Sequence, residues 1–154
     1  MKVAVAADHG GFPLKNLVIE IVQEAGHQVI DLGTFSPESV DYADYSEKAG
    51  NALQSGEVDR AVLLCGSGVG VCIAANKMQG VYAAVCHDTY TAHQGVEHDH
   101  MNAVCIGARV VGPELVKEIV KSFLSAQFSE DPRFLRRIEK VKRLEDRFLS
   151  SRNQ

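Results

Sequence analysis

A cysteine followed by three alternating glycines is the part of this chain best suited to do chemistry. The segment Cys65–Gly70 reads Cys-Gly-Ser-Gly-Val-Gly and lies between the apolar runs 60–64 and 71–77. We therefore expect a buried strand that enters a glycine loop and then a helix. Glycines let the backbone approach a ligand closely, and a helix start presents unpaired N–H groups, so such a turn suits an anion. The same field favours a thiolate, which predicts a base at Cys65 beside a cradle for negative charge.

This loop does not match the common nucleotide-binding patterns. It is not Gly-x-Gly-x-x-Gly, and no Lys-Ser or Lys-Thr pair follows it, which argues against dinucleotides and triphosphates. Two plainer interpretations stay open, a purely structural tight turn and, for Cys65, an inert core thiol. Cys72, Cys86 and Cys105 lack a position before the loop, and we expect them to be packing residues.

A second polar group follows the first apolar run, 2–7, where Asp8 and His9 precede two glycines. The alternative interpretation is an aspartate that caps the next helix beside a solvent-exposed histidine. The run His98–His100 contains two histidines and one aspartate, too few well-spaced ligands to indicate a metal site. We therefore expect no metal ion.

Three arginines could hold a phosphate dianion, since guanidinium is permanently charged and binds such groups with two parallel hydrogen bonds. Arg109 comes just after the apolar run 103–107. Arg133 and Arg137 are four residues apart, which places them on one face of an expected final helix. Taken alone, this last pair is equally typical of a solvated helix face.

Apolar runs alternate with helical patterns along the whole chain. We expect strands near 2–7, 28–32, 60–65, 81–86 and 103–107. We expect helices near 12–25, 42–55, 70–78, 88–96 and 113–126, with a last helix that starts within 129–132. This alternation predicts a three-layer, doubly wound, Rossmann-like α/β fold with a five-stranded parallel sheet, order 2-1-3-4-5, and an extra C-terminal helix. In that order strands 1 and 3 are neighbours, so Asp8, His9 and Cys65 would converge on one crevice.

Composition predicts a single globular domain over residues 1–154, with 45% apolar and 23% charged residues. No apolar run approaches the ~20 residues that span a bilayer, and the start of the chain does not resemble a signal peptide. None of the four cysteines forms a Cys-x-x-Cys pair, which favours a reduced, cytoplasmic location and no membrane partner.

The net charge of −4 is unevenly distributed along the chain. Residues 133–154 carry 8 basic and 3 acidic side chains, against 8 and 17 in the rest. A basic tail can indicate nucleic-acid binding. Apolar residues recur there at helical spacing, however, so we interpret the charges as the wet face of an amphipathic helix and expect no nucleic-acid partner. That apolar stripe comprises Phe134, Ile138, Val141, Leu144 and Phe148.

Taken together, these motifs resemble a sugar-phosphate isomerase family that contains the type B ribose-5-phosphate isomerases and the galactose-6-phosphate isomerase subunits. The similarity extends over nearly the whole chain. The segments that carry it are Asp8–Gly11, Asp31–Thr34, Asp41 and Tyr42 with Tyr45, Cys65–Gly70, Ala74–Lys77, Cys86–Asp88, Gly107–Gly112, and Arg133 with Arg137.

The resemblance implies interconversion of an aldose phosphate and its ketose with neither metal nor organic cofactor. Cys65 would remove the proton from C2 of the open-chain sugar, and the amides of Gly66, Ser67, Gly68, Val69 and Gly70 would hold the enediolate oxygen. Some members carry a carboxylate directly after the last loop glycine; here that residue is Val71, which cannot act as a base. Ser67 would help to shuttle a proton, and His98 would open the sugar ring.

The remaining roles concern binding. The resemblance implies sugar contacts from Asp8, His9 and Tyr42, and phosphate contacts from Arg109, Arg133 and Arg137. It also implies a homodimer, or a tetramer built from it, in which the last helix reaches the neighbouring subunit and the active sites are shared.

The chain departs from the family pattern at Asp99, where an asparagine is usual, and at His100, where an aspartate or asparagine is usual. Aspartate only accepts hydrogen bonds when ionised and adds negative charge near an anionic substrate. Two alternatives to a ribose 5-phosphate isomerase stay open: an isomerase of a six-carbon phosphate such as allose or galactose 6-phosphate, and a phosphosugar-binding module without activity. The retained Cys65, Ser67 and His98 favour an enzyme.

Overall fold

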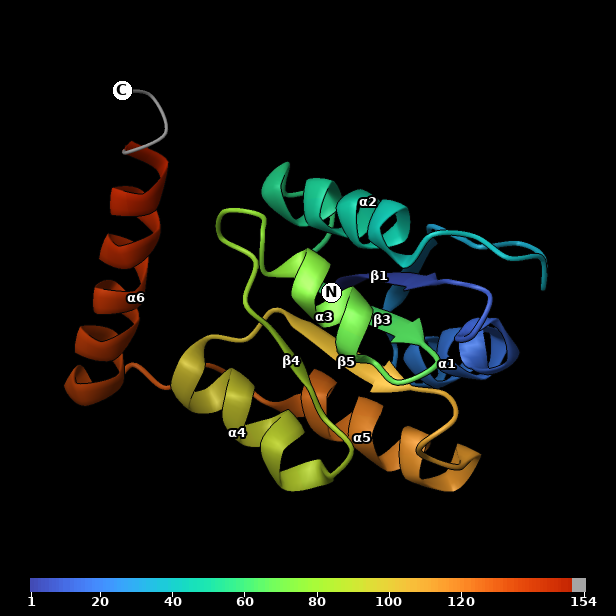
Figure 1. The fold of residues 1–154 in the computed structure, drawn as a ribbon. Helices are drawn as coiled ribbons and strands as arrows, with labels where there is room; N and C mark the ends of the chain where they lie inside the picture. Colours follow the sequence, from blue (N-terminus) through green and yellow to red (C-terminus); the bar gives the residue numbers. More distant parts are fainter. Residues whose placement is uncertain (151–154) are drawn as a thin grey trace.

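The computed structural model describes residues 1–150, and side chains through residue 147, so the predicted apolar contact of Phe148 lies outside the described part. The strands are β1 (Lys2–Ala7), β2 (Gln28–Asp31), β3 (Arg60–Cys65), β4 (Ala83–Val85) and β5 (Ala103–Gly107). The helices are α1 (Phe12–Glu24), α2 (Tyr42–Gln54), α3 (Val69–Ala75), α4 (Thr89–Asp99), α5 (Pro113–Ser125) and α6 (Pro132–Ser150). Figure 1 shows these elements in the colours of the sequence.

All five strands form one parallel sheet, in the order β2-β1-β3-β5-β4. The predicted doubly wound α/β class is confirmed, with β1 beside β3 as expected. The predicted order 2-1-3-4-5 is wrong for its last two strands, because β5 pairs with β3 and β4 lies at the edge.

The burial of the two strands explains this correction. Every residue of β5 is buried, as in a central parallel strand, whereas β4 has only three residues and all are half-buried. Asn76 covers the free edge of β4: its Oδ1 accepts a hydrogen bond from the Ala83 amide at 2.9 Å, and its Nδ2 donates to the Ala83 carbonyl at 2.8 Å. A short strand whose unpaired backbone is bonded to a side chain is suited to an edge.

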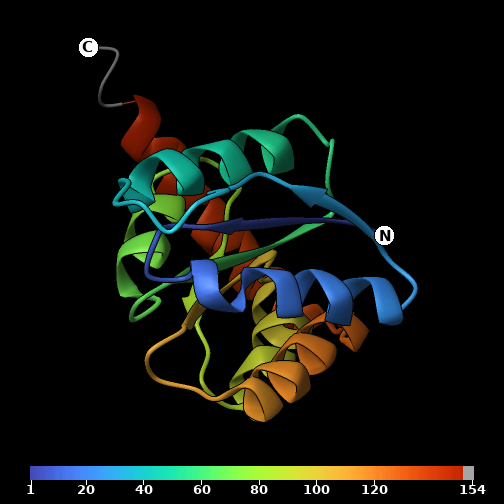
Figure 2. The same ribbon diagram turned by 90° about the vertical axis from the view of Figure 1, so that its right-hand side faces the viewer.

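Two helical layers cover the sheet. Helices α1, α4 and α5 pack on one face and α2 and α3 on the other, as Figures 1 and 2 show. On the α2–α3 face the strands present small side chains such as Ala4, Ala61 and Ala103. On the opposite face they present larger ones such as Val62, Leu64 and Ile106. Small residues let α3 lie close to β3 and β5, which positions the loop between β3 and α3.

Most helix boundaries follow local signals. Gly26, with φ of 81°, follows the end of α1, and Gly112 and Pro113 begin α5 as predicted. Helix α4 is longer than expected and continues to Asp99, where His100 ends it with φ of 58°. His98 and Asp99 therefore lie on the last turn of α4.

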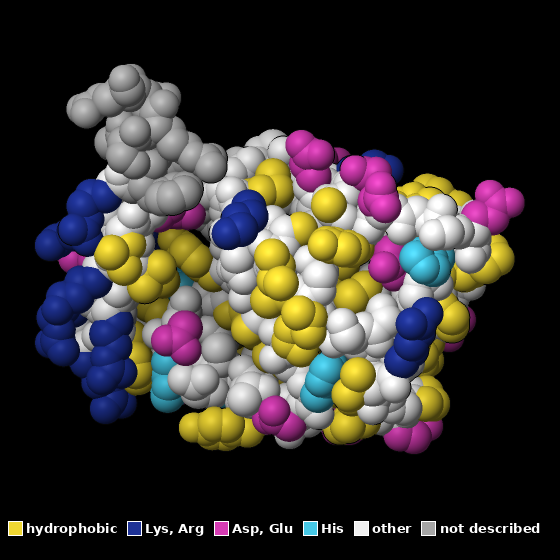
Figure 3. Space-filling view, viewed as in Figure 1, with side chains coloured by type: hydrophobic (Ala, Val, Ile, Leu, Met, Phe, Trp, Pro, Cys, Tyr) yellow, Lys and Arg dark blue, Asp and Glu magenta, His cyan; other side chains and the backbone are white. Residues whose placement is uncertain are grey.

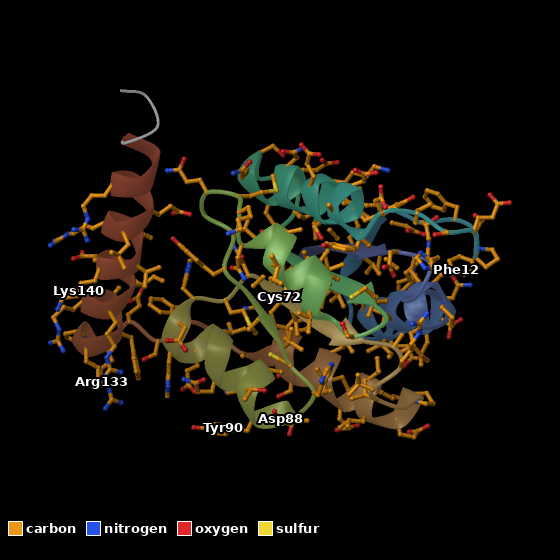
Figure 4. All side chains as sticks on the ribbon, viewed as in Figure 1. Phe12, Cys72, Asp88, Tyr90, Arg133 and Lys140 are labelled. Atoms are coloured by element: carbon orange, nitrogen blue, oxygen red, sulfur yellow. The ribbon has the colours of Figure 1, made fainter. Side chains whose placement is uncertain are left out.

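Helix α6 packs against α4 and extends past the body of the molecule (Figure 1). Phe134 and Ile138 are buried, while Val141 and Leu144 of the same predicted stripe are 44% and 59% exposed. Basic side chains cover the outer side of α6 in Figure 3, and Arg133 and Lys140 project away from the body in Figure 4. No helix within the described residues is long and apolar enough to cross a membrane.

Candidate active site

The loop between β3 and α3 wraps around the sulfur of Cys65. The amide of Gly68 donates a hydrogen bond to Cys65 Sγ at 3.0 Å. Gly68 is the N-cap of α3 and has φ of 80°, a left-handed conformation that favours glycine. The amides of Ala108 and Arg109 donate to the carbonyls of Cys65 and Gly66 at 2.8 and 3.0 Å, which continues the β3–β5 pairing into the loop.

Close backbone contacts hold this loop between the segment that follows β1 and the end of β5. A Cβ added to Gly10 would lie 2.8 Å from the Gly66 nitrogen, and one added to Gly107 would lie 2.6 Å from the Ser67 carbonyl carbon. Both distances are too short for a real side chain. The glycines after β1 and at the end of β5 thus let three chain segments meet at the carboxyl edge of the sheet.

A pocket of about 380 Å³ opens at this meeting point. Its lining residues are Asp8, Tyr42, Cys65, Gly66, Ser67, Gly70, Arg109 and Val110. Cys65 is only 4% exposed, but it forms part of the pocket wall. The structure therefore brings together the residues that follow β1, β3 and β5, at the position where doubly wound folds bind ligands.

Asp8 organises the loop after β1. It is 7% exposed, and its Oδ1 accepts hydrogen bonds from the amides of Gly10 and Gly11 at 2.8 and 2.9 Å. The alternative that Asp8 caps α1 is wrong, because the N-cap is Gly11. His9 points elsewhere, with Nδ1 3.2 Å from the carbonyl oxygen of Val40. It thereby connects this loop to the segment before α2.

Three further side chains border the pocket opening. The ring of Tyr42 lies over Gly70, where an added Cβ would be 3.1 Å from it. The guanidinium of Arg109 lies over Gly66 in the same way, at 3.3 Å. Ser67 is exposed, and its Oγ accepts a hydrogen bond from the Val69 amide at 3.3 Å. An anion in the pocket would thus meet a cation, a hydroxyl and loop amides.

The other predicted site residues lie in a second cleft. His98, Asp99 and Arg137 line a space of about 440 Å³ bordered by β4, α4 and α6. The His98 ring stacks on the Phe134 ring, with centroids 4.1 Å apart and 14° between planes. Arg133 lies over the same Phe134 ring, with Cζ 4.5 Å from its centroid. In Figure 1, α3 and β4 lie between α6 and the loop that joins β3 to α3. Within one chain, the predicted site residues therefore fall into two separate groups, one at each cleft.

Three residues at these places were missed by sequence reasoning. His87 accepts a hydrogen bond from the Gly107 amide through Nε2 at 3.0 Å, next to the loop. The sequence predicts Phe134 only as part of the apolar stripe of the last helix. Gln94 contacts His98 and Asp99. It lies four residues before His98, which indicates a contact on one helix face, but the sequence predicts that this helix ends at residue 96.

Among residues 1–150, no group of three or more His, Cys, Asp or Glu side chains is placed to hold a metal ion.

The fold and the pocket define the class of protein. Residues 3–141 match the model of the Ribose/Galactose Isomerase family, and the chain belongs to this family. It is 43% identical to ribose-5-phosphate isomerase B of Escherichia coli, over 95% of this chain and 97% of that protein. It is 39% identical to D-erythrulose-4-phosphate isomerase of Pectobacterium atrosepticum, over 83% and 85% of the two chains.

Solved structures agree with this membership. The structure of Clostridium thermocellum ribose-5-phosphate isomerase B is similar to this one with a TM-score of 0.93 and 41% identity, over 96% of this chain and 99% of that one. The predicted resemblance is therefore confirmed at the level of the family, and the protein is an isomerase that acts on sugar phosphates.

Proposed function

We propose that the protein interconverts ribose 5-phosphate and ribulose 5-phosphate through an enediolate, with Cys65 as the base. The observation that carries this proposal is the position of Cys65 Sγ, at the wall of an open pocket and 3.0 Å from the Gly68 nitrogen. Val71, where some relatives carry a carboxylate, is fully buried and apolar. With no carboxylate at position 71, the sulfur of Cys65 is the base in this proposal.

The reaction needs no external electron donor. Cys65 takes the C2 proton, the C2–H electron pair forms the C1–C2 double bond, and the carbonyl pair moves to O1. Transfer of the O2 proton to O1 and return of a proton to C1 give the ketose. The loop amides that do not already donate to Cys65 Sγ or Ser67 Oγ stabilise the charge on oxygen, and one well-placed donor of this kind contributes about 3–4 kcal/mol. Asp8 and Tyr42 contact the sugar, and Ser67 assists the proton transfer.

A second copy of the chain completes the site in this proposal. His98, which opens the ring, and Arg133 and Arg137, which hold the phosphate, lie away from Cys65 in the same chain. Helix α3 exposes apolar side chains, with Val69 49% and Ile73 57% exposed, and Figure 3 shows hydrophobic side chains over α3. The cleft between α4 and α6 also presents apolar side chains, among them Met101, Ile138 and Val141. In a two-fold dimer, α3 of each copy would pack at this cleft of the other.

The base assignment is tested by Cys65→Ala. We expect turnover to fall by at least about 1,000-fold while ribose 5-phosphate still binds, because the variant lacks the base but keeps the pocket. Exchange of the C2 proton with solvent, followed by NMR, reports the chemical step directly. Cys72→Ala, one turn into α3, is the matched control and should keep turnover within about threefold. Near-normal C2 exchange in Cys65→Ala would refute the assignment.

The shared site is tested by mixing two inactive variants. Cys65→Ala and His98→Ala are each expected to be inactive on the cyclic sugar. After the two variants are unfolded and refolded together in equal amounts, half of the dimers are hybrids, and each hybrid carries one intact site out of two. The mixture therefore contains about a quarter of the active sites of the wild-type protein. Recovery to about that fraction supports the shared site. Two variants that stay inactive after hybrids are detected by mass would contradict it.

The preferred sugar is decided by a panel of four-, five- and six-carbon aldose phosphates. The similarity to a D-erythrulose-4-phosphate isomerase favours a tetrose phosphate as the second candidate. One added or missing methylene group alone changes kcat/KM by about 10- to 200-fold in a shaped pocket, so we expect sugars of different length to be clearly ranked. A kcat/KM highest for a four- or six-carbon sugar would replace ribose 5-phosphate in this proposal.

A further inference from the structure

The side-chain amide of Gln94 bridges the two polar residues at the end of α4. Its Nε2 lies 3.0 Å from His98 Nδ1 and 3.2 Å from Asp99 Oδ2. Gln94 precedes His98 by one helical turn, so all three groups belong to one rigid element. None of the roles described above uses Gln94.

The hydrogen-bonding chemistry of these contacts determines which ring nitrogen of His98 carries the hydrogen. An ionised carboxylate only accepts hydrogen bonds, so Asp99 requires the amide nitrogen of Gln94, rather than its oxygen, to face it. That NH₂ group carries two hydrogens, and the second points to His98. His98 Nδ1 must then accept, and a neutral imidazole whose Nδ1 accepts carries its hydrogen on Nε2.

The orientation of the His98 ring is fixed as well. Stacking on Phe134 sets the plane of the ring, and the Gln94 contact sets its rotation within that plane. The nearest carboxylate oxygen to Nε2, Oε2 of Glu97, is 3.7 Å away, beyond hydrogen-bond distance. The side chain of His98 is 31% exposed and lines the cleft, so a ligand there can reach the ring.

We propose that Gln94 is a positioning residue that holds His98 in its Nε2–H form, so that Nε2 donates the proton to the ring oxygen of a cyclic sugar phosphate. This role rests on the proposed function, since it gives His98 its task. When the ring opens, the C1–O bond breaks, its electron pair goes to the ring oxygen, and that oxygen takes the Nε2 proton. The C1 hydroxyl loses its proton to solvent, which forms the aldehyde, and solvent returns a proton to His98 Nε2, so the ring is neutral again after each opening.

Asp99 belongs to the same arrangement. An asparagine at this position could face Gln94 with either its oxygen or its nitrogen. Only the carboxylate makes the direction of the Gln94 amide unique, and therefore the position of the His98 proton. Asp99 and Gln94 are thus two parts of one arrangement.

The proton position is measured by ¹⁵N NMR of histidine-labelled protein, with the His98 signals assigned by comparison with His98→Asn. We expect the Nε2–H form in the wild type. In Gln94→Glu a carboxylate, which only accepts hydrogen bonds, faces Nδ1, so we expect the hydrogen on Nδ1 and none on Nε2. Gln94→Met removes the donor with little change in shape, and should give a mixture of the two neutral forms.

Kinetics on two substrates then distinguish an effect of Gln94 on the His98 proton from a general loss of folded enzyme. Erythrose 4-phosphate carries its phosphate on O4 and cannot form a five-membered ring, so it needs no ring opening. We expect Gln94→Glu to lower kcat/KM for ribose 5-phosphate at least about 10-fold, because one proton donor contributes a factor of ~100 or more, and to leave the tetrose rate within about twofold. A thermal melt of each variant shows that the fold is retained.

An Nδ1–H form of His98 in the wild type, or an unchanged spectrum in Gln94→Glu, would overturn the proposal, and so would equal losses on the two sugars. The NMR measurement needs no turnover. A wild-type protein without activity on ribose 5-phosphate would overturn the proposed function, while the spectra would still decide what Gln94 does to His98.

Discussion

The amide of Gly68 points at the sulfur of Cys65 from 3.0 Å, and this is possible only because Gly68 adopts φ of 80°. The left-handed turn folds the loop back over the end of β3. The backbone of β5 closes the other side, with the Gly107 nitrogen 3.0 Å from where a Cβ on Gly68 would be. The geometry of the proposed base therefore depends on one backbone conformation and on the strand next to β3.

Gly68→Ala should damage both stability and activity. A left-handed alanine costs about 1–2 kcal/mol, and its Cβ would also press on the backbone of Ile106 and Gly107. We expect the free energy of unfolding in urea to fall by more than that amount, and turnover to fall at least tenfold. Gly56→Ala is the control, because Gly56 has φ of 72° and open space around it. Equal effects in the two variants would show that the loop contact is unimportant.

Cys72 should react with alkylating agents near neutral pH. A hydrogen bond with Cys105, aided by the Val85 backbone and Asn76 against the effect of burial, lowers the pKa of the Cys72 thiol from 9.0 to about 7. Burial raises the pKa of Cys86, and the pKa of Cys105 is raised well above 9.0, first by its hydrogen bond with Cys72. Iodoacetamide should therefore label Cys72 before Cys86 and Cys105, with a midpoint near pH 7 by mass spectrometry.

The same pKa shift makes the free energy of unfolding depend on pH in a defined direction. The thiolate of Cys72 is favoured in the folded state, so its contribution is present above pH 9 and is lost as the pH falls through about 7. Cys72→Ser should flatten the dependence of the unfolding free energy on pH between those limits. Labelling of Cys72 that begins only near pH 9 would contradict the prediction.

The ion pair between Lys15 and Asp31 should be costly to break. Lys15 is almost fully buried, and its Nζ lies 2.8 and 2.7 Å from the two carboxylate oxygens. We expect Lys15→Met to destabilise the protein by about 2–4 kcal/mol, because Asp31 is left partly buried without its cation. Adding Asp31→Leu should recover part of that loss in urea unfolding. A double variant less stable than Lys15→Met would show that Asp31 contributes independently of Lys15.

Phe134 should decide whether α6 stays on the body. It is 4% exposed and stacks on His98, whereas Leu135 on the same helix is 40% exposed. Phe134→Ala should reduce the free energy that holds α6 on the body by about 3–5 kcal/mol. Hydrogen exchange of the backbone amides of α6 should therefore become faster. Leu135→Ala should leave that exchange near the wild-type rate. Slow exchange of α6 in Phe134→Ala would show that other contacts hold the helix.

The sequence predicted most of the local structure correctly, because the signals are local. Gly26, Gly112 and Pro113 mark helix ends through their own backbone preferences, and the structure confirms each of them. Helix α4 was predicted too short, since the turn that contains His98 carries polar residues on both sides. Its last turn is held by tertiary contacts, such as the bond from the Ser129 amide to the Glu97 carbonyl at 2.8 Å.

What the sequence by itself determined is the α/β class, the pairing of β1 with β3, and the convergence of Asp8 and Cys65 on one edge. These follow from hydrophobic periodicity, turn residues and the rule for parallel sheets, which all act over short stretches of chain. Only the tertiary structure placed β5 between β3 and β4, divided the predicted site residues between two clefts, and joined Gln94 to His98. Strand order and side-chain contacts depend on which surfaces bury best against each other, and that competition is settled by the whole folded chain.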